Sequence, residues 1–175
     1  MAIIILPVNV LVFIPGFILW ISPQSKFPPV LVTPGQVWFW LGLAAAFTGL
    51  TLIIWTATLF LKFGKGTPAP WNPPQKLVIR GPYRHVRNPM IIGVLLCLLA
   101  ESILFQSWRL FGWMIIFFIC NAVYFPRDEE RRLQQKFGPA YLQYKEHVPR
   151  WTPRFTSWKQ ETEYSSPARP TRHSY

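Results

Sequence analysis

The sequence predicts an all-α fold, a polytopic bundle of about four transmembrane helices with a C-terminal amphipathic helix over its cytoplasmic mouth. Hydrophobic residues make up 51% of the 175 residues, with 9 Trp and 14 Phe among the chain's aromatic residues. That is more apolar surface than a soluble domain of this length needs to bury. The apolar residues also gather in four long segments. We expect spans over residues 3–21, 37–61, 90–105 and 108–125.

The first predicted span contains prolines and the third is short, and both features affect the helices that we expect. Pro7 and Pro15 in the first segment predict a kinked helix. No Lys or Arg precedes its apolar run as in a cleaved signal peptide, so we expect it to remain as a helix. The third segment is the shortest and covers roughly 24 Å, slightly less than a hydrocarbon core of ~30 Å.

Basic residues predict the orientation of the spans. The connection after the first span contains only Lys26, and the turn after the third contains only Arg109. The second connection contains six basic residues: Lys62, Lys65, Lys76, Arg80, Arg84 and Arg87. Ten more follow Phe125. The positive-inside rule therefore places both termini and the second connection in the cytoplasm. The net charge of +11 then reflects topology, and we expect no nucleic-acid partner.

A very short turn at Gln106-Ser107 joins the third and fourth segments, so they should form an antiparallel hairpin. Its two cytoplasmic ends must then lie close together. One end is the basic stretch 80–90, and the other is the charged stretch 127–132, which contains Glu129 and Glu130. The sequence therefore predicts a site where cationic and acidic side chains meet at a membrane surface.

An amphipathic helix is predicted over about residues 128–147. Its apolar residues fall three or four positions apart: Leu133, Phe137, Tyr141, Tyr144 and Val148. Gly138-Pro139 interrupts the pattern. This helix is expected to lie against the membrane or to fold over the hairpin as a lid. Residues 1–154 then form a single domain, and residues 155–175 form a polar, disordered tail.

The cysteines and the glycine-rich loop of the chain do not predict a metal site or a nucleotide site. Cys97 and Cys120 lie in apolar segments without ligand spacing, so we expect no metal. Gly64-Lys-Gly-Thr67 lacks the order of a phosphate-binding loop. Glu101 is unusual because a charge inside a span is costly. It is expected either to pair, for example with Arg109, or to have a role toward substrate.

Two separated motifs are similar to those of the isoprenylcysteine carboxyl methyltransferase and phospholipid methyltransferase superfamily of membrane enzymes. The matching residues are Gly81-Pro-Tyr-Arg84, Arg87-Asn-Pro89, Gly93, Glu129-Glu130, Leu133, Phe137-Gly138, Tyr141, Tyr144, Val148-Pro-Arg150 and Pro153. The chain departs from the family's usual pattern at Asn88, where His is common, and at Ile91, where Tyr is common.

The resemblance implies a methyltransferase that binds S-adenosylmethionine at the cytoplasmic mouth and takes a lipophilic acceptor from the bilayer. It implies catalytic roles for Arg87, Glu130 and Arg150. The cofactor-binding residues that it implies are Tyr83, Arg84, Arg87, Asn88, Pro89, Gly93, Glu129, Glu130 and Tyr141. Guanidinium groups suit the cofactor's carboxylate, and carboxylates suit its positive groups or ribose hydroxyls.

Several alternatives remain open at this point. The acceptor group could be a carboxylate, an amine or a thiol. A membrane reductase of the sterol type, using a reduced nicotinamide cofactor, resembles the same C-terminal region. A non-enzymatic membrane subunit whose basic loops bind anionic lipid is the third reading. The loop Gly66-Thr-Pro-Ala-Pro70 resembles bacterial members of the superfamily, so a bacterial inner membrane is favoured over the endoplasmic reticulum.

Overall fold

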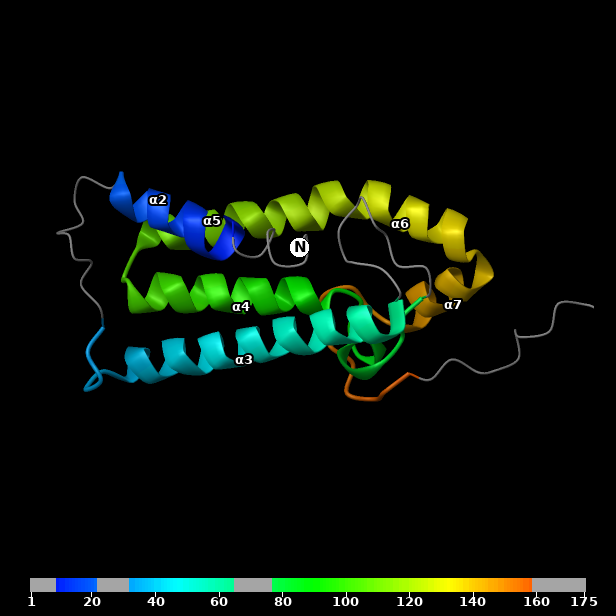
Figure 1. The fold of residues 1–175 in the computed structure, drawn as a ribbon, viewed down its shortest axis with the longest axis horizontal. Helices are drawn as coiled ribbons and strands as arrows, with labels where there is room; N and C mark the ends of the chain where they lie inside the picture. Colours follow the sequence, from blue (N-terminus) through cyan, green and yellow to red (C-terminus); the bar gives the residue numbers. More distant parts are fainter. Residues whose placement is uncertain (1–8, 22–31, 65–76, 159–175) are drawn as a thin grey trace, which may run out of the picture.

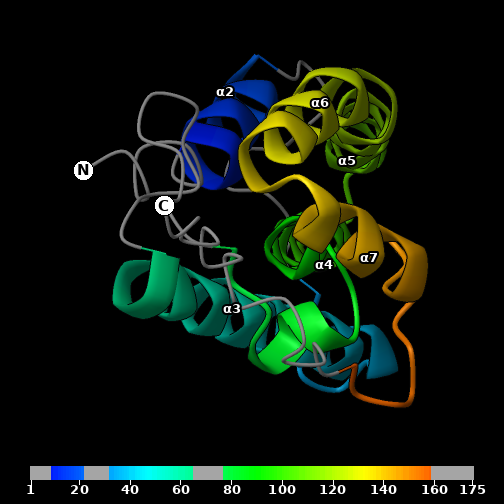
Figure 2. The ribbon, with the colours of Figure 1, turned by 90° about the vertical axis from the view of Figure 1, so that its right-hand side faces the viewer.

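A computed structural model describes residues 9–21, 32–64 and 77–158, without the side chains of residues 124–129. Within these ranges every regular element is a helix, which confirms the all-α prediction there (Figure 1). The helices are η1 (Asn9–Phe13), α2 (Ile14–Trp20), α3 (Val37–Leu59), η2 (Phe60–Gly64), η3 (Gly81–Arg84), α4 (Pro89–Leu104), α5 (Trp108–Ile119), η4 (Cys120–Tyr124), α6 (Phe125–Phe137) and α7 (Pro139–His147). The end-on view in Figure 2 shows α4 between α3 and α5.

The four predicted spans are not confirmed. Among the described residues, only the helix Val37–Gly64 is long and apolar enough to cross a membrane. The apolar helices Asn9–Trp20, Pro89–Leu104 and Trp108–Val123 are shorter. At 1.5 Å per residue they fall short of a ~30 Å hydrocarbon core. Large side chains on α3 nevertheless point outward, including Phe47 at 74% exposure and Ile54 at 65%. An apolar face of this kind marks contact with lipid or with another protein.

Kinks are predicted at Pro7 and Pro15, and the described structure shows a change from π-helix to α-helix beside Pro15. This residue is in the first turn of α2, directly after the π-helical turn η1. Proline has no amide hydrogen to donate and restricts the preceding residue, so a break in regular α-helix is expected there. Pro7 lies outside the described residues.

Small residues allow α3 and α4 to pack with their backbones close together. Gly42, Gly49 and Thr56 are buried at intervals of seven residues on α3. A Cβ atom added at Gly49 would lie 2.6 Å from the carbonyl oxygen of Gly93 on α4, and one added at Gly93 would lie 2.9 Å from the carbonyl oxygen of Gly49. Small residues at such a crossing are typical of helix pairs in membranes, because dispersion contacts replace the hydrophobic effect there.

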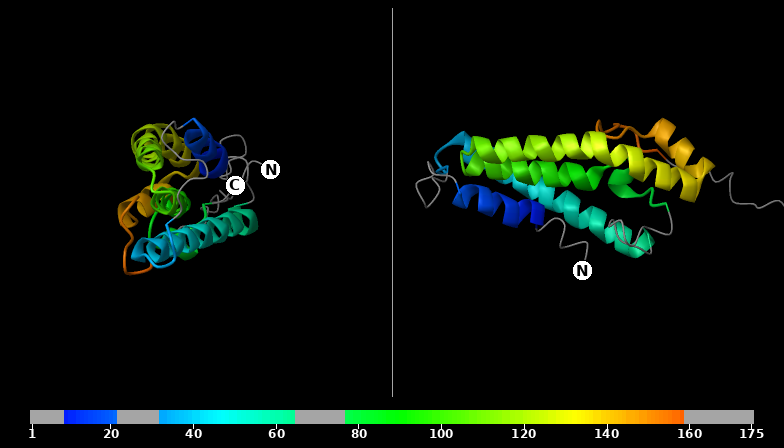
Figure 3. Two further views of the ribbon diagram at one scale, coloured as in Figure 1. Left: turned by 90° about the vertical axis from the view of Figure 1, so that its left-hand side faces the viewer. Right: turned by 90° about the horizontal axis from the view of Figure 1, so that it is seen from above.

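The predicted hairpin is confirmed by the turn between α4 and α5. Gln106 adopts a positive φ of 48°, and Ser107 is the N-cap of α5, its hydroxyl accepting a hydrogen bond from the amide of Leu110. From α5 the chain continues through η4 into α6 along nearly one line (Figures 1 and 3). The segment predicted as one amphipathic helix over 128–147 therefore consists of two helices, and the first prolongs the hairpin.

Gly138 reverses the chain between these two helices. It has φ 54°, a value that favours glycine, and Pro139 begins α7. After α7, residues 148–158 run beside residues 84–87, joined by backbone hydrogen bonds from Arg87 to Pro149, from Arg154 to His85 and from Trp158 to Arg84. The described residues continue to 158, four positions past the predicted domain boundary at residue 154. Trp158 packs on Tyr144 with 5.8 Å between ring centroids, which holds this end in place.

The crossing of α3 and α4 gives a stability prediction. The substitution Gly49→Ala should destabilise the protein by about 1–3 kcal/mol, because the new methyl group overlaps the Gly93 carbonyl and forces the backbones apart. The control is Gly112→Ala on α5, where nothing lies within 4 Å of an added Cβ. Thermal unfolding in detergent should show a lower Tm for Gly49→Ala alone. Equal Tm values for the two variants would contradict the close crossing.

Candidate functional site

The site is built on the connection between α3 and α4, residues 77–88. Gly81 begins the turn η3 with φ 55°, which favours glycine, and a Cβ added there would make tight contacts with Trp55 and Leu59 of α3. The turn ends at Arg84, Asn88 is the N-cap of α4, and Pro89 is in its first turn. The chain direction therefore changes twice within eight residues. Neighbouring side chains in this connection therefore face different parts of the protein.

Glu130 on α6 is the centre of an ion-pair cluster. Its Oε1 accepts a hydrogen bond from Nη1 of Arg87 at 2.7 Å and a second from Nη2 of Arg150. Its Oε2 lies 2.8 Å from Nζ of Lys145 on α7. The side chains of Arg87, Glu130 and Arg150 are mostly buried, at 13%, 16% and 21% exposure. The predicted convergence of basic and acidic side chains is confirmed by these contacts.

The electrostatics of the cluster favour an ionised Glu130 carboxylate. Partial burial acts to raise the pKa of Glu130. Hydrogen bonds from Lys145 and Arg150, together with the charges of Arg87 and Arg150, outweigh burial and hold the pKa below its usual range. Among the described side chains, which exclude those of residues 124–129, three cations contact the Glu130 carboxylate. In addition, the buried Nε of Arg87 has no hydrogen-bond partner within the described structure.

A second set of contacts fixes the position of the segment that carries Arg87. The hydroxyl of Tyr144 donates a hydrogen bond of 2.7 Å to the carbonyl oxygen of Tyr83. The amide of Arg87 donates to the carbonyl of Pro149 at 2.9 Å. Tyr141, Tyr144 and Val148 form a buried cluster, and burial raises the pKa of Tyr144. These contacts tie α7 and residues 148–150 to the segment that carries Arg87.

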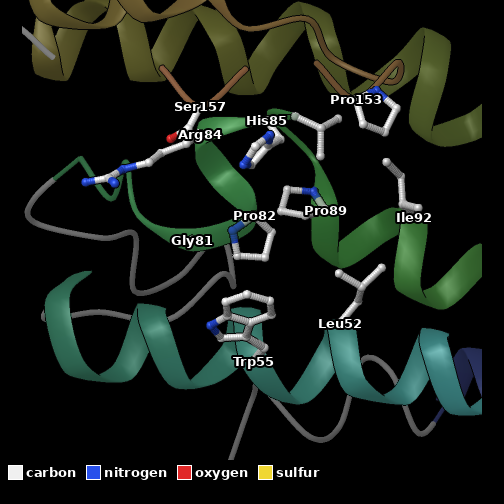
Figure 4. Close-up of a pocket in the computed structure, with 11 residues that line it drawn as sticks. Leu52, Trp55, Gly81, Pro82, Arg84, His85, Pro89, Ile92, Pro153 and Ser157 are labelled. Atoms are coloured by element: carbon white, nitrogen blue, oxygen red, sulfur yellow. The ribbon is translucent and has the colours of Figure 1, made fainter. Parts of the chain in front are cut away.

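A cavity of about 500 Å³ lies on another side of the same segment (Figure 4). Leu52 and Trp55 of α3 form one wall, and Pro82, Pro89 and Ile92 face them. Arg84, His85 and Ser157 line the end where the C-terminal segment passes. The cavity has mainly apolar walls, with its polar groups at one end.

The structure places the predicted site residues in three surroundings. Arg87, Glu130 and Arg150 meet in the cluster. Arg84 and Pro89 line the cavity, and Asn88, the N-cap of α4, directly precedes Pro89. Tyr83, Gly93 and Tyr141 are buried in packing contacts: Tyr83 against Phe60, Gly93 at the α3–α4 crossing, and Tyr141 beside Tyr144. Glu129 is on α6, and its side chain lies outside the described residues.

Sequence reasoning missed Lys145, which completes the cluster, and Trp55, which forms the cavity wall. The signal for Lys145 was the break at Gly138-Pro139, since a reversal there brings α7 back toward α6. No pattern in the sequence indicated Trp55, because its position depends on how α3 packs against residues 81–82.

The remaining polar predictions concern Glu101 and metals. No ion pair joins Glu101 to Arg109 among the described residues, and the Oε2 atom of Glu101 is buried without a hydrogen-bond partner there. In the described part of the chain, no group of three or more His, Cys, Asp or Glu side chains is arranged to hold a metal ion.

Comparison with known proteins gives one match. The family model described as phospholipid methyltransferase matches residues 37–140, which include α3, α4, the hairpin and α6. No curated protein and no solved structure matches the chain.

The cluster predicts a pH dependence of stability. A carboxyl group whose folded-state pKa is lowered contributes stability above its unfolded pKa of about 4.3 and loses it as the pH falls through the lower folded value. The variant Glu130→Gln should therefore be less stable than the wild type at neutral pH, by about 1–3 kcal/mol, because buried cations lose their partner. The difference should shrink below about pH 4. Tm measured against pH tests this.

The matched control is Glu146→Gln, on the exposed face of α7. It should leave the pH profile of the wild type unchanged. A Glu130→Gln variant that parallels the wild type across the whole pH range would contradict the cluster's contribution.

Proposed function

The chain belongs to the phospholipid methyltransferase family, and from this premise we propose that it is an integral membrane methyltransferase that transfers a methyl group from S-adenosylmethionine to a lipophilic acceptor. The observation that carries the proposal is the Glu130 cluster, in which Arg87, Arg150 and Lys145 contact one carboxylate. It joins the start of α4, α6 and the C-terminal segment at one end of the bundle. The acceptor group, whether a carboxylate, an amine or a thiol, is left open.

The cluster's donors suit this cofactor. Arg87 and Arg150 have guanidinium hydrogens beyond those that Glu130 accepts, and the buried Nε–H of Arg87 is without a hydrogen-bond partner in the described structure. The cofactor's carboxylate would accept from such donors. A carboxylate has about four lone-pair positions. Within the described structure Glu130 uses three of them for Arg87, Arg150 and Lys145, so its role toward the cofactor is to hold these cations in place.

Each residue then has a defined role in the transfer. When bound, the cofactor supplies a methyl group activated by a positively charged sulfur. Arg87 and Arg150 hold the carboxylate of the cofactor, and Glu130 orients both arginines. Glu130 is a poor base, since its lowered pKa and three cationic partners keep the proton away from it. The buried cluster of Tyr141, Tyr144 and Val148 excludes water beside the site. Orientation of two bound partners can supply most of the acceleration.

For localisation, we propose an integral membrane protein whose cluster end, with both termini, faces the cytoplasm. The exposed apolar face of α3 and the excess of basic residues in the connections support this arrangement. A bacterial inner membrane stays the favoured prediction.

Calorimetric titration of the detergent-purified protein tests the proposed function. S-adenosylmethionine and its demethylated product should both bind. The substitutions Arg87→Gln and Glu130→Gln should each weaken binding about tenfold or more, through loss of a charged hydrogen bond worth ~1.5–3 kcal/mol. The control is Arg131→Gln, an exposed arginine on α6 next to Glu130. It should bind as the wild type does.

Two outcomes would reject the methyltransferase. Binding of reduced nicotinamide adenine dinucleotide phosphate in place of S-adenosylmethionine would indicate a reductase. Binding of none of these ligands by a folded protein would indicate a non-enzymatic subunit.

A further inference from the structure

The cavity in Figure 4 contains an imidazole that the proposed cofactor site does not use. His85 lines the cavity, and its Nδ1 lies 2.8 Å from the carbonyl oxygen of Arg154. A carbonyl can only accept a hydrogen bond, so in the neutral ring Nδ1 carries the proton and Nε2 carries a lone pair. Among the described residues Nε2 has no hydrogen-bond partner. The ring is therefore fixed in orientation, with one acceptor atom left for an occupant of the cavity.

The other lining residues limit the charge that an occupant can have. Most of the wall consists of apolar side chains from α3, α4 and the prolines between them. No Asp or Glu is among the described lining residues, so an ammonium group would be buried there without a counter-ion. Arg84 offers no cation to an anionic group, because its Nε donates to the carbonyl of Ile79 and its guanidinium extends away from His85 (Figure 4). The lining therefore favours a neutral molecule.

His85 is also close to the proposed cofactor site. It precedes Arg87 by two positions, and two residues of extended chain span at most about 7 Å. Val86, between them, lines the cavity, whereas the side chain of Arg87 pairs with Glu130. A short carbon chain joins the carboxylate of S-adenosylmethionine to its sulfur. A cofactor held through Arg87 would therefore have its sulfur near the segment that carries His85.

A base beside the acceptor matters only for some nucleophiles. Hydroxyl and thiol groups are weak nucleophiles until they lose a proton, and a positioned imidazole can take it. A carboxylate is already ionised near neutral pH and needs no base. An imidazole with a bare Nε2 in an uncharged cavity therefore suits a neutral O–H or S–H group.

We propose that His85 is a catalytic base for a methyl acceptor that is neutral and apolar and whose nucleophile is a hydroxyl or a thiol. The inference rests on the proposed function. Nε2 takes the proton of the O–H or S–H group as the oxygen or sulfur forms its bond to the methyl carbon. The bond from that carbon to the sulfonium breaks, and its electron pair stays on the cofactor's sulfur as a neutral thioether. The imidazolium then returns its proton to water.

Nitrogen NMR of the full chain, with nitrogen-15 in its histidines, tests the acceptor atom without any turnover. The chain has 3 histidines, and His85→Phe and His147→Phe assign their signals. In the free protein Nε2 of His85 should have the chemical shift of a bare ring nitrogen. Octylphenol or octanethiol should move this signal toward that of a hydrogen-bonded nitrogen. Octylanisole, which has the shape of octylphenol without the O–H donor, should leave it unchanged.

His147 is the matched control within the same spectrum. Its Nδ1 also lies 2.8 Å from a carbonyl oxygen, that of Gln143, but the residue is exposed on α7 and does not line the cavity. Its Nε2 signal should not respond to either probe. Leu52→Trp, which fills the cavity and keeps the imidazole, should abolish the response of His85. Pro153→Trp, which fills the cavity from the C-terminal segment, replaces it if the helix variant fails to fold.

Methyl transfer to octylphenol and octanethiol tests the chemical step. His85→Phe should lower the rate at least about a hundredfold, since a positioned base contributes about 10²–10⁴-fold. Calorimetry should show unchanged affinity of this variant for S-adenosylmethionine. His147→Phe should keep the wild-type rate. The probe that is methylated shows whether the nucleophile is a hydroxyl or a thiol.

Four results would overturn the proposal: a protonated Nε2 of His85 in the free protein at neutral pH, equal responses to octylphenol and octylanisole, equal rates for the wild type and His85→Phe, and no methyl transfer to either neutral probe. A protein that gives any of these and still binds S-adenosylmethionine keeps its proposed function. A response of Nε2 in a protein that binds no S-adenosylmethionine would reject the methyltransferase and leave a binding site for neutral hydrogen-bond donors.

Discussion

The ion pair between Arg87 and Glu130 fixes the geometry on which the rest of the candidate site depends. It joins residues 43 positions apart, one before α4 and one on α6, which lie at the same end of the α4–α5 hairpin. Arg150 and Lys145 add two further elements to the same carboxylate. Glu130 therefore joins the same chain segments that backbone hydrogen bonds and the Tyr144 hydroxyl also link. Its negative charge allows Arg87, Arg150 and Lys145 to lie close together.

The second feature that positions the site is the close packing of α3 against α4. The crossing at Gly49 and Gly93 brings α3 near enough for Trp55 to contact Gly81, and this contact determines where the turn η3 lies. As a result, Arg84 and His85 line the cavity, and the side chain of Arg87 reaches Glu130 on α6. Small residues in the helices thus position charged residues in a loop, although they touch no ligand themselves.

Some of this arrangement could be predicted from the sequence, for identifiable reasons. A turn as short as Gln106-Ser107 permits only an antiparallel hairpin, so the meeting of Arg87 and Glu130 followed from loop length. The four spans are not confirmed, because among the described residues only Val37–Gly64 is long and apolar enough to cross a membrane, although α4 coincides with the predicted segment 90–105. Lys145 and Trp158 reach their places through the reversal at Gly138 and the packing of Tyr144, which are tertiary effects.

A double-mutant cycle on Arg87 and Glu130, read out as affinity for S-adenosylmethionine, tests the central claim most directly. If the two residues act as one unit, Arg87→Gln and Glu130→Gln together should weaken binding no more than the stronger single substitution, giving a coupling energy of about 1 kcal/mol or more. Losses that simply add would contradict the account, since each residue would then contact the cofactor independently of the other. Unchanged affinity in all three variants would remove the cluster from the cofactor site altogether.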